Sequence, residues 1–277
     1  MEIKIEVERL RERPLVIATP AYGGMVSTPF HLAMIDTANR FSQLGINLKH
    51  CMLENESLVT RARNNLAKMF MHDDGFNHLL FIDADIKFAP DDILSMLSLD
   101  YDVIAGCYPK KSINWSAVHK AVLRGVPPEQ LSQFIGDHVL NFVPKEGQQV
   151  FRLDEPIEVL DAGTGFMMIK RHVFEKMMEA YPEIRYDPDY TLGNPLFDEH
   201  KASGVYAFFD TEIVDVNHGM QKGQQRYLSE DYSFCHKWRN IGGKIFVVPF
   251  VSLGHHGSYH YTGNLRAVLG LMDESRQ

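Results

Sequence analysis

The stretch that decides the fold is His78-Leu79-Leu80-Phe81-Ile82, which leads directly into Asp83-Ala84-Asp85. A short, nearly continuous apolar run that ends in polar turn residues predicts a buried β-strand. Side chains at positions i and i+2 of an extended segment point the same way, so both carboxylates are expected on one side as the strand leaves the sheet. In open α/β sheets, ligands collect at this end of the strands.

The segments around this strand alternate between strand-like and helix-like patterns. Strands are predicted at Pro14–Ala18, Ile46–Leu53 and Tyr101–Ala105, and helices at Thr28–Gln43 and Ser57–His72. This alternation is typical of an α/β protein with a mostly parallel sheet. We therefore expect a Rossmann-type, mixed but mostly parallel sheet flanked by helices.

The two long helices carry more detailed expectations. In the first, Leu32, Ile35, Ala38 and Phe41 are predicted to share the buried face, and in the second Ser57 is a plausible N-cap. Thr19 to Gly24, before the first helix, reads as a turn.

The second half of the chain continues the α/β pattern after a break. Residues 108–157 are less regular, so a single domain is predicted with a nucleotide-binding half at 14–107, an insertion at 108–157 and a second half at 158–263. The elements expected in the second half are strands at Ile157–Leu160, Gly165–Ile169, Tyr206–Phe209 and Ile245–Val251, and helices at Arg171–Ala180 and Ser229–Asn240.

The bulk composition excludes some classes of protein. The 277 residues carry a net charge of −8 with no basic block, which argues against nucleic acid as the main partner. The three cysteines have no metal-site or disulfide spacing. No signal sequence and no run of about 20 apolar residues is present, so a cytoplasmic protein is expected, in the host cytoplasm if the chain is viral.

A second polar segment accompanies Asp83 and Asp85. Ser252-Leu-Gly-His255-His256-Gly257 follows a predicted strand, and a neutral imidazole is a good ligand for borderline divalent ions. Asp83, Asp85 and His255 are therefore candidate ligands for Mn²⁺, or Mg²⁺ in its place, with His256 as a phosphate contact or bystander. A hard cation held in this way bridges the oxygens of a diphosphate. The competing interpretation is two solvated acids in a turn and a surface histidine.

Taken in order, the motifs resemble those of the GT-A glycosyltransferases, particularly the family 2-like and phage or viral enzymes. The resemblance runs from about Pro14 to Gly263. It rests on VIATPAY, SLVTRARNN, LLFIDADI, AGTGFMMIKR, SEDYSF and LGHHG. It implies transfer of a hexosyl or pentosyl group from a nucleotide-sugar donor, with UDP-sugars favoured, to a glycan or other hydroxyl acceptor.

The resemblance also implies donor contacts. The residues that it places against the nucleoside, the diphosphate or the donor sugar are Thr19, Pro20, Ala21, Tyr22, Arg61, Asn64, Asp83, Ala84, Gly163, Thr164 and His256. For each, an ordinary structural role is the alternative: a strand-to-helix turn for 19–24, a solvated helix face for Arg61, and a tight turn for the two glycines of Asp161–Gly165.

An inverting transfer needs one carboxylate to accept the proton of the acceptor hydroxyl. Glu230 and Asp231 open a predicted helix after the Gly- and Gln-rich segment 219–225, whose composition suits a mobile lid. By the resemblance Asp231 is the base, with Glu230 as the alternative. Acidic residues are also favoured in the first turn of any helix by its dipole. Trp115 is a possible sugar-stacking residue, whereas Trp238 is expected in the core.

Two other functions stay open. A sugar nucleotidyltransferase also combines this fold with a divalent ion, although the turn TPAYGGM lacks the basic residue of a typical phosphate loop. A non-catalytic module that binds a nucleotide sugar or a glycan would keep the fold without the reaction. The oligomeric state and the identities of the sugar and acceptor are not predicted.

Overall fold

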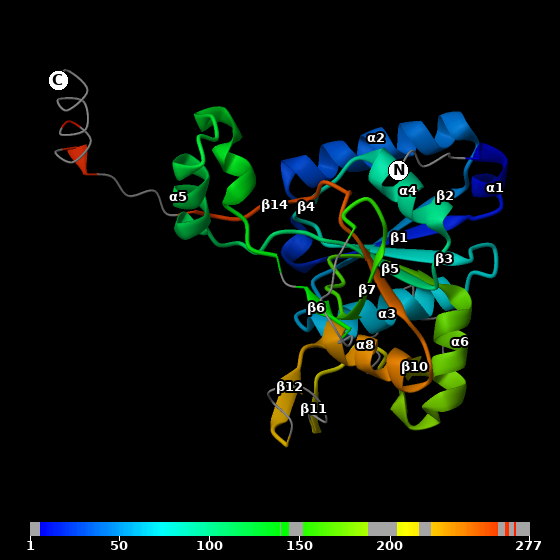
Figure 1. The fold of residues 1–277 in the computed structure, drawn as a ribbon. Coiled ribbons are helices and arrows are strands. Elements are labelled where there is room, and N and C mark those ends of the chain that lie inside the picture. The colour runs from blue at the N-terminus through cyan, green and yellow to red at the C-terminus, as the bar shows by residue number, and fades with distance from the viewer. Residues whose placement is uncertain are drawn as a thin grey trace.

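A computed structural model describes residues 6–138, 140–143, 152–187, 204–215 and 223–259, together with residues 264, 265 and 269. Its centre is an eight-stranded sheet (Figure 1). In spatial order the strands are β2 (Leu48–Glu54), β1 (Leu15–Ala21), β3 (His78–Ile82), β8 (Phe166–Lys170), β5 (Val103–Gly106), β13 (Ile245–Val248), β7 (Ile157–Asp161) and β6 (Asn141–Phe142).

The sheet is mixed, and most of its strands share one direction. β1 pairs in parallel with β2 and β3, and β13 with β5, whereas β8 lies antiparallel between β3 and β5. β7 is antiparallel to both β13 and β6. Only β8 and β7 therefore oppose the other strands of this sheet, and the predicted α/β class with a mixed, mostly parallel sheet is confirmed.

Helices cover both faces of the sheet (Figure 1). On one face lie α1 (Val7–Arg11), α2 (Thr28–Leu44) and α4 (Pro90–Leu99); on the other lie α3 (Val59–Met71), α6 (Arg171–Ala180) and α8 (Glu230–Asn240). Each layer has its own apolar core. Phe30, Phe41 and Leu97 belong to the first, and Phe70, Phe174 and Phe234 to the second. Burial of these large side chains is the main force that holds the layers together.

Strands from all three predicted segments contribute to this one sheet. The first half supplies β1, β2, β3 and β5, the insertion supplies β6, and the second half supplies β8 and β13, with β7 beginning at its border. The insertion also forms α5 (Trp115–Leu123) and the 3₁₀ helix η2 (Pro128–Phe134), which project from the body (Figure 1). Residues 139 and 144–151 of the insertion lie outside the described residues.

Three short strand pairs lie outside the main sheet in the described part of the chain. They are β4 (Ile86–Lys87) with β14 (Gly254–His255), β9 (Arg185–Tyr186) with β10 (Val205–Tyr206), and β11 (Glu212–Asp215) with β12 (Gln225–Leu228). Short 3₁₀ helices lie at Tyr22–Gly24 and Pro182–Ile184. The first of the pairs matters most here, because it joins the segment after β3 to the segment after β13.

The predicted buried face of α2 is correct at Phe41 and wrong at Leu32, Ile35 and Ala38. The helix buries Phe30, Ala33, Thr37 and Phe41, whereas Leu32 and Ile35 are 55% and 45% exposed. The predicted residues recur every three positions, and with 3.6 residues per turn such a series drifts around the helix. The buried set recurs at three and four positions and therefore stays on one side.

Several predicted boundaries also need correction. β1 continues to Ala21, so Thr19 to Ala21 are strand rather than turn. Helix α3 begins at Val59 with Leu58 as its N-cap residue, and Glu56 accepts a hydrogen bond from the Leu58 N–H at 3.0 Å, so Ser57 is not the cap. The last predicted strands shorten to Val205–Tyr206 and Ile245–Val248. Trp238 is in the core as expected, 3% exposed.

Candidate functional site

The aspartates of Asp83-Ala84-Asp85 lie in a turn at the end of β3. The N–H of Ile86 donates to the carbonyl of Asp83 at 3.0 Å, and the N–H of Ser27 donates to the carbonyl of Ala84 at 2.8 Å. The expectation that both carboxylates project from one extended segment is therefore wrong. The turn gives Asp83 and Asp85 different partners.

Asp85 lies beside His255, as the sequence predicts. The Nε2 atom of His255 is 3.4 Å from Oδ1 of Asp85. The backbone explains this proximity, because β14 pairs with β4 and the N–H of His256 donates to the carbonyl of Asp85 at 2.8 Å. The other carboxylate oxygen, Oδ2, forms an ion pair with Lys111. Burial raises the pKa of Asp85, but hydrogen bonds from His255 and Lys111 outweigh this effect and lower that pKa to about 2.

The orientation of the His255 ring is fixed from behind. Its Nδ1 lies 2.9 Å from the carbonyl oxygen of Pro109, and a carbonyl can only accept, so the Nδ1 proton must be the donor. When the ring is protonated, both nitrogens donate and Nε2 hydrogen-bonds to Asp85; when the ring is neutral, Nε2 keeps a lone pair on that side that a metal can use. Tyr108 packs edge-on against the same ring, with centroids 5.4 Å apart. The hydrogen bond from Nδ1 to the Pro109 carbonyl is the kind of support that metal-binding histidines normally have.

Asp83 belongs to a second cluster, built around Arg63. Nη2 of Arg63 donates to Oδ1 of Asp83 at 2.9 Å, and Nε lies 3.4 Å from Oε1 of Glu230. The Arg63 side chain is 4% exposed and lies over the ring of Phe81 at 5.5 Å. A buried guanidinium needs opposite charge nearby. Arg63 thereby joins helix α3 to the turn after β3 and to the start of α8.

Asp231 lies next to Glu230, in the first turn of α8. Its carboxylate accepts a hydrogen bond from the Ser229 hydroxyl and another from the Tyr232 N–H at 2.8 Å. Burial raises the pKa of Asp231, although these two hydrogen bonds partly oppose the effect. A carboxylate with a raised pKa accepts a proton more readily than an exposed one. Of the segment 219–225, residues 219–222 lie outside the described residues.

Gly163 and Gly165 pack tightly against Tyr108, on either side of the buried Thr164. A Cβ added at Gly163 would lie 2.3 Å from the Tyr108 hydroxyl, and one at Gly165 would lie 2.7 Å from it and 3.0 Å from Oδ2 of Asp83. The Gly165 N–H also donates to this hydroxyl at 3.2 Å. In this structure the close approach that the glycines permit is that of a side chain of the same chain.

Two buried polar atoms near these residues lack hydrogen-bond partners among the described residues. They are Nη1 of Arg63 and Oγ1 of Thr164. Buried polar atoms are usually paired, so unpaired ones next to a cluster of charges are typical of sites where a ligand or water completes the bonding. Burial raises the pKa of Tyr108 strongly, with Asp83 and Asp231 adding to the effect, so these three groups share one electrostatic environment.

The residues expected to line the nucleoside pocket differ in exposure. Thr19 is fully buried, with its hydroxyl 3.1 Å from Nε2 of His50, and Ala21 is 1% exposed. Pro20 is partly exposed and Tyr22 is 70% exposed, on the 3₁₀ turn after β1. Tyr22 is therefore the residue of this group with a surface available for stacking.

The hydrogen bonds of Arg61 and Asn64 are made to residues other than Asp83, Asp85 and His255. Arg61 pairs with both carboxylate oxygens of Glu56, at 2.6 and 2.7 Å. The Asn64 amide makes two hydrogen bonds with the backbone of Phe209, at 3.0 and 2.9 Å. Both residues line a cavity bordered by Arg185, Asp210 and Lys237. Asn64 thus anchors the segment 204–215 to α3.

The predicted three-ligand set is not assembled in this structure. Among the residues that the structure describes, no three His, Cys, Asp or Glu side chains are gathered as a metal site. Asp85 and His255 are adjacent, whereas Asp83 pairs with Arg63. His256 is exposed, and its backbone N–H rather than its ring makes the contact with Asp85.

Arg63, Tyr108 and Lys111 are missing from the sequence-based site. Arg63 could have been recognised from the sequence. It lies three residues before Leu66 and seven before Phe70, and therefore on the apolar stripe of α3. A charged residue there has to be paired. Tyr108 and Lys111 follow β5, whose carboxyl end meets the same edge of the sheet as that of β3.

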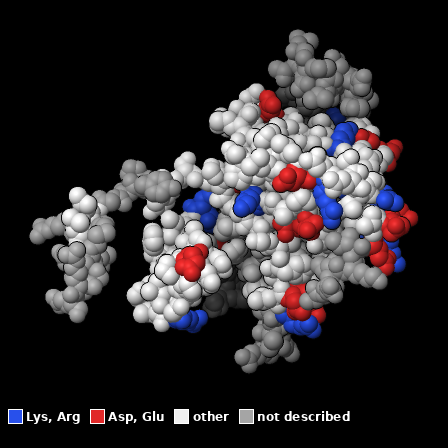
Figure 2. Space-filling model, turned by 90° about the horizontal axis from the view of Figure 1, so that it is seen from above, with Lys and Arg blue, Asp and Glu red and all other residues white. Residues whose placement is uncertain are grey.

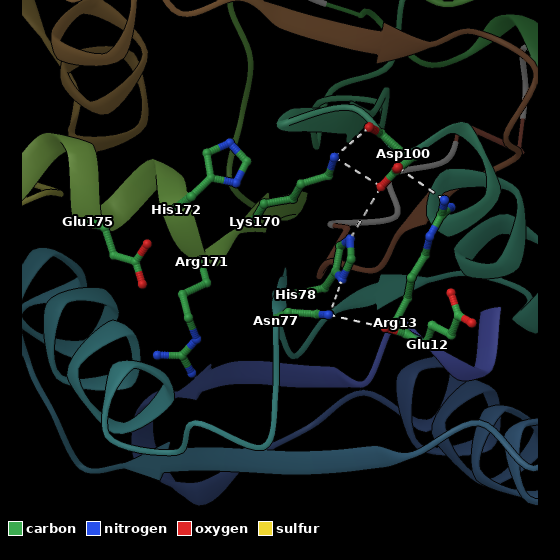
Figure 3. Close-up of a pocket in the computed structure, with 9 residues that line it drawn as sticks. All are labelled: Glu12, Arg13, Asn77, His78, Asp100, Lys170, Arg171, His172 and Glu175. Carbon is green, nitrogen blue, oxygen red and sulfur yellow. Dashed lines mark hydrogen bonds and ion pairs between the residues drawn. The ribbon is translucent and has the colours of Figure 1, made fainter. Parts of the chain in front are cut away.

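A separate pocket lies at the opposite end of β3, around His78 (Figure 3). There the carboxylate of Asp100 lies 3.0 Å from Nη2 of Arg13, 2.9 Å from Nζ of Lys170 and 3.8 Å from Nε2 of His78. Arg171 turns away from this group and donates to backbone carbonyls, among them those of Phe70 and Phe76 at 2.8 Å. These contacts tie the chain together at the starts of the strands, far from Asp83.

On the face seen in Figure 2, basic and acidic residues are interspersed, and neither sign covers a broad area. Among the described residues, no helix combines the length and apolar character needed to cross a membrane.

Comparison with known proteins finds structural likeness without sequence relatives. No protein-family model matches the chain, and no curated protein matches it in sequence. The solved structures that match include A197 from STIV, with 16% identity, a TM-score of 0.47, and coverage of 88% of this chain and 86% of that one.

Two further matches differ in their activities. One is GalNAc-T7 with UDP, GalNAc and Mn²⁺, with 12% identity, a TM-score of 0.38, and coverage of 88% of this chain and 44% of that one. The other is 4-diphosphocytidyl-2C-methyl-D-erythritol synthase from Anaerococcus prevotii, with 7% identity, a TM-score of 0.36, and coverage of 96% and 99%. At such values no activity transfers to this chain, so its function has to be argued from its own side chains.

Proposed function

We propose that this chain is a metal-dependent glycosyltransferase that uses a nucleotide-sugar donor, with UDP-sugars as the first candidates. The observation that carries the proposal is the approach of His255 Nε2 to within 3.4 Å of Asp85 Oδ1, at the strand ends where α/β proteins bind ligands. Residues more than 160 positions apart are brought together there by the pairing of β4 with β14.

The donor set fits a divalent cation. Asp85 offers a hard carboxylate oxygen, and His255 offers Nε2, the ring nitrogen that is not engaged with the Pro109 carbonyl. Asp85 and His255 would hold Mn²⁺ or Mg²⁺, and the remaining positions would go to diphosphate oxygens and water, as is usual for these ions. When bound, the cation would neutralise the charge on the departing nucleoside diphosphate.

The carboxylates of α8 supply the proton acceptor in this proposal. The acceptor hydroxyl oxygen bonds to the anomeric carbon, the bond from that carbon to the diphosphate oxygen breaks with its electron pair leaving on the diphosphate, and Asp231 takes the hydroxyl proton. Inversion at the anomeric carbon follows from this single displacement. The raised pKa of Asp231 suits the role. Glu230 would not take the proton. Its ion pair with Arg63 would hold the start of α8, and with it Asp231, in place.

The test is a panel of UDP-, GDP- and dTDP-sugars, each incubated with the purified chain with and without Mn²⁺. Donor binding is measured by thermal shift, because a ligand that binds only the native state raises its melting temperature. Release of the nucleoside diphosphate is measured in parallel. Metal-dependent binding and release support the proposal. Binding without release over many acceptors would favour a binding module, and release of pyrophosphate from a nucleoside triphosphate with a sugar phosphate would favour a nucleotidyltransferase.

A further inference from the structure

Lys111 occupies one side of the Asp85 carboxylate. Its ammonium pairs with Oδ2 of Asp85 while His255 faces Oδ1 of the same group. Asp85 is 34% exposed and Lys111 is 45% exposed, so the pair lies at the mouth of the site rather than in the core. One carboxylate is therefore shared between a fixed imidazole and an internal cation.

The segment Tyr108 to Lys111 acts on this site in two opposite ways. Tyr108 and the Pro109 carbonyl orient His255 so that its Nε2 atom faces Asp85, which prepares a metal ligand. Lys111, two residues further on, places a positive charge against the carboxylate that would share the metal. Like charges at such short range repel, so a divalent cation and this ammonium compete for Asp85.

The Lys111 side chain can leave at modest cost. Its charge is carried on a flexible four-carbon stem, and exposed ion pairs contribute little to stability. The stem packs against Gly257, where an added Cβ would lie 2.9 Å from Cδ of Lys111. Any larger side chain at position 257 would overlap the Lys111 stem, so the glycine leaves room for that stem beside the site.

We infer that Lys111 is a displaceable counter-cation that neutralises Asp85 until a divalent metal takes its place. This inference rests on the proposed function, because it concerns the same metal site. Displacement would free the ammonium beside the bound cation, where the charge of a donor diphosphate would attract it. Lys111 would then link metal loading to donor binding.

The test measures Mn²⁺ binding by calorimetry in the absence of any donor. Lys111→Met keeps the aliphatic stem and removes the charge, and Lys110→Met is the matched control on the exposed neighbouring residue. If Lys111 competes with the metal, K111M binds Mn²⁺ roughly 1.5-fold to fivefold more tightly than the wild-type chain, the range expected for removal of a partly exposed ion pair. K110M binds with unchanged affinity. Equal or weaker binding by K111M overturns the inference.

Folding and function are separated by two further measurements. The metal-free melting temperatures of K111M and the wild-type chain should agree, which shows that the variant folds. Because the titration contains no donor, a chain that fails on the whole donor panel but binds Mn²⁺ more tightly as K111M would sink the proposed function and leave this inference standing. Absence of Mn²⁺ binding by both chains would overturn the inference.

Discussion

Arg63 donates to Asp83 over 2.9 Å from inside helix α3, and the same guanidinium lies 3.4 Å from Glu230. This contact assigns the two aspartates of the Asp83-Ala84-Asp85 turn to different tasks. Asp83 is held by a buried cation of the protein, and Asp85 is left for His255 and Lys111. The candidate site therefore consists of two adjoining charge clusters.

Replacement of Arg63 by Met should destabilise the protein, because two partly buried carboxylates would lose their shared partner. We expect the free energy of unfolding to fall by about 2–3 kcal/mol, measured by urea denaturation. Arg61→Met is the control two residues away, where an exposed pair with Glu56 is removed and a loss below about 1 kcal/mol is expected. Similar losses in the two variants would contradict a structural role for the Arg63 cluster.

Replacement of Gly165 by Ala should disturb Tyr108 and Asp83 together. The added methyl group would lie 2.7 Å from the Tyr108 hydroxyl and 3.0 Å from Asp83 Oδ2, which is closer than van der Waals contact allows. We expect a loss of about 1–3 kcal/mol in the free energy of unfolding. Removing the Tyr108 ring in the double variant G165A/Y108A should relieve part of the clash, so the two losses should not add. If the losses in the free energy of unfolding of the two single variants add in the double variant, the methyl group of G165A does not clash with Tyr108, and the prediction is contradicted.

Asp231→Asn tests the assignment of the base. If Asp231 accepts the acceptor proton, its replacement lowers kcat by a factor of about 10²–10⁴ while donor binding in the thermal-shift assay is retained. Glu230→Gln is the matched variant on the neighbouring residue and should reduce kcat much less. The reverse order of the two effects would move the role to Glu230.

The buried His78 should make the stability of the folded chain depend on pH, separately from the candidate functional site. Burial, assisted by Lys170, lowers the pKa of His78 to about 4 from its usual 6.5. As the pH falls below 6.5, the unfolded chain takes up a proton that the folded chain accepts only near pH 4. Stability from this group is therefore fully present above pH 6.5 and is lost progressively between pH 6.5 and 4, by on the order of 3 kcal/mol.

The measurement is the free energy of unfolding at a series of pH values for the wild-type chain and for His78→Gln. The variant should show a shallower decline between pH 6.5 and 4, because Gln does not titrate. Replacement of the exposed His119 by Gln provides the control at a second histidine. An unchanged pH profile in the His78 variant would contradict the assigned shift.

The sequence predicts the layers of this fold well, because they depend on local patterns. The strand His78–Ile82 and the helix Arg171–Ala180 have the predicted bounds, since an apolar run and a helical stripe each report burial directly. The buried face of α2 differs from the predicted one because residues spaced by three positions do not stay on one side of a helix. The pairing of β4 with β14 was missed because strands of two residues leave no periodic signal.

The site was predictable in part, for a related reason. Asp85 and His255 stand out as metal-ligand types after strands, and the structure places them together. Whether they bind a metal stays a prediction, as do the donor contacts and the division into halves. Residue type alone does not distinguish Arg63 from Arg61, two positions earlier on the same helix, because their burial depends on the tertiary packing. The ion pair of Lys111 with Asp85 cannot be predicted from the sequence, because it depends on the path that the chain takes after β5.

The position of β8 has a consequence for how the chain acquires its structure. β3 and β5 are separated by only about 20 residues, yet they do not pair with each other, because β8 at 166–170 lies between them. A nascent chain that ends before β8 lacks the strand that joins its first three strands to β5. We therefore expect cooperative assembly to wait until β8 has been synthesised, and shorter fragments to remain prone to aggregation through their unpaired edges.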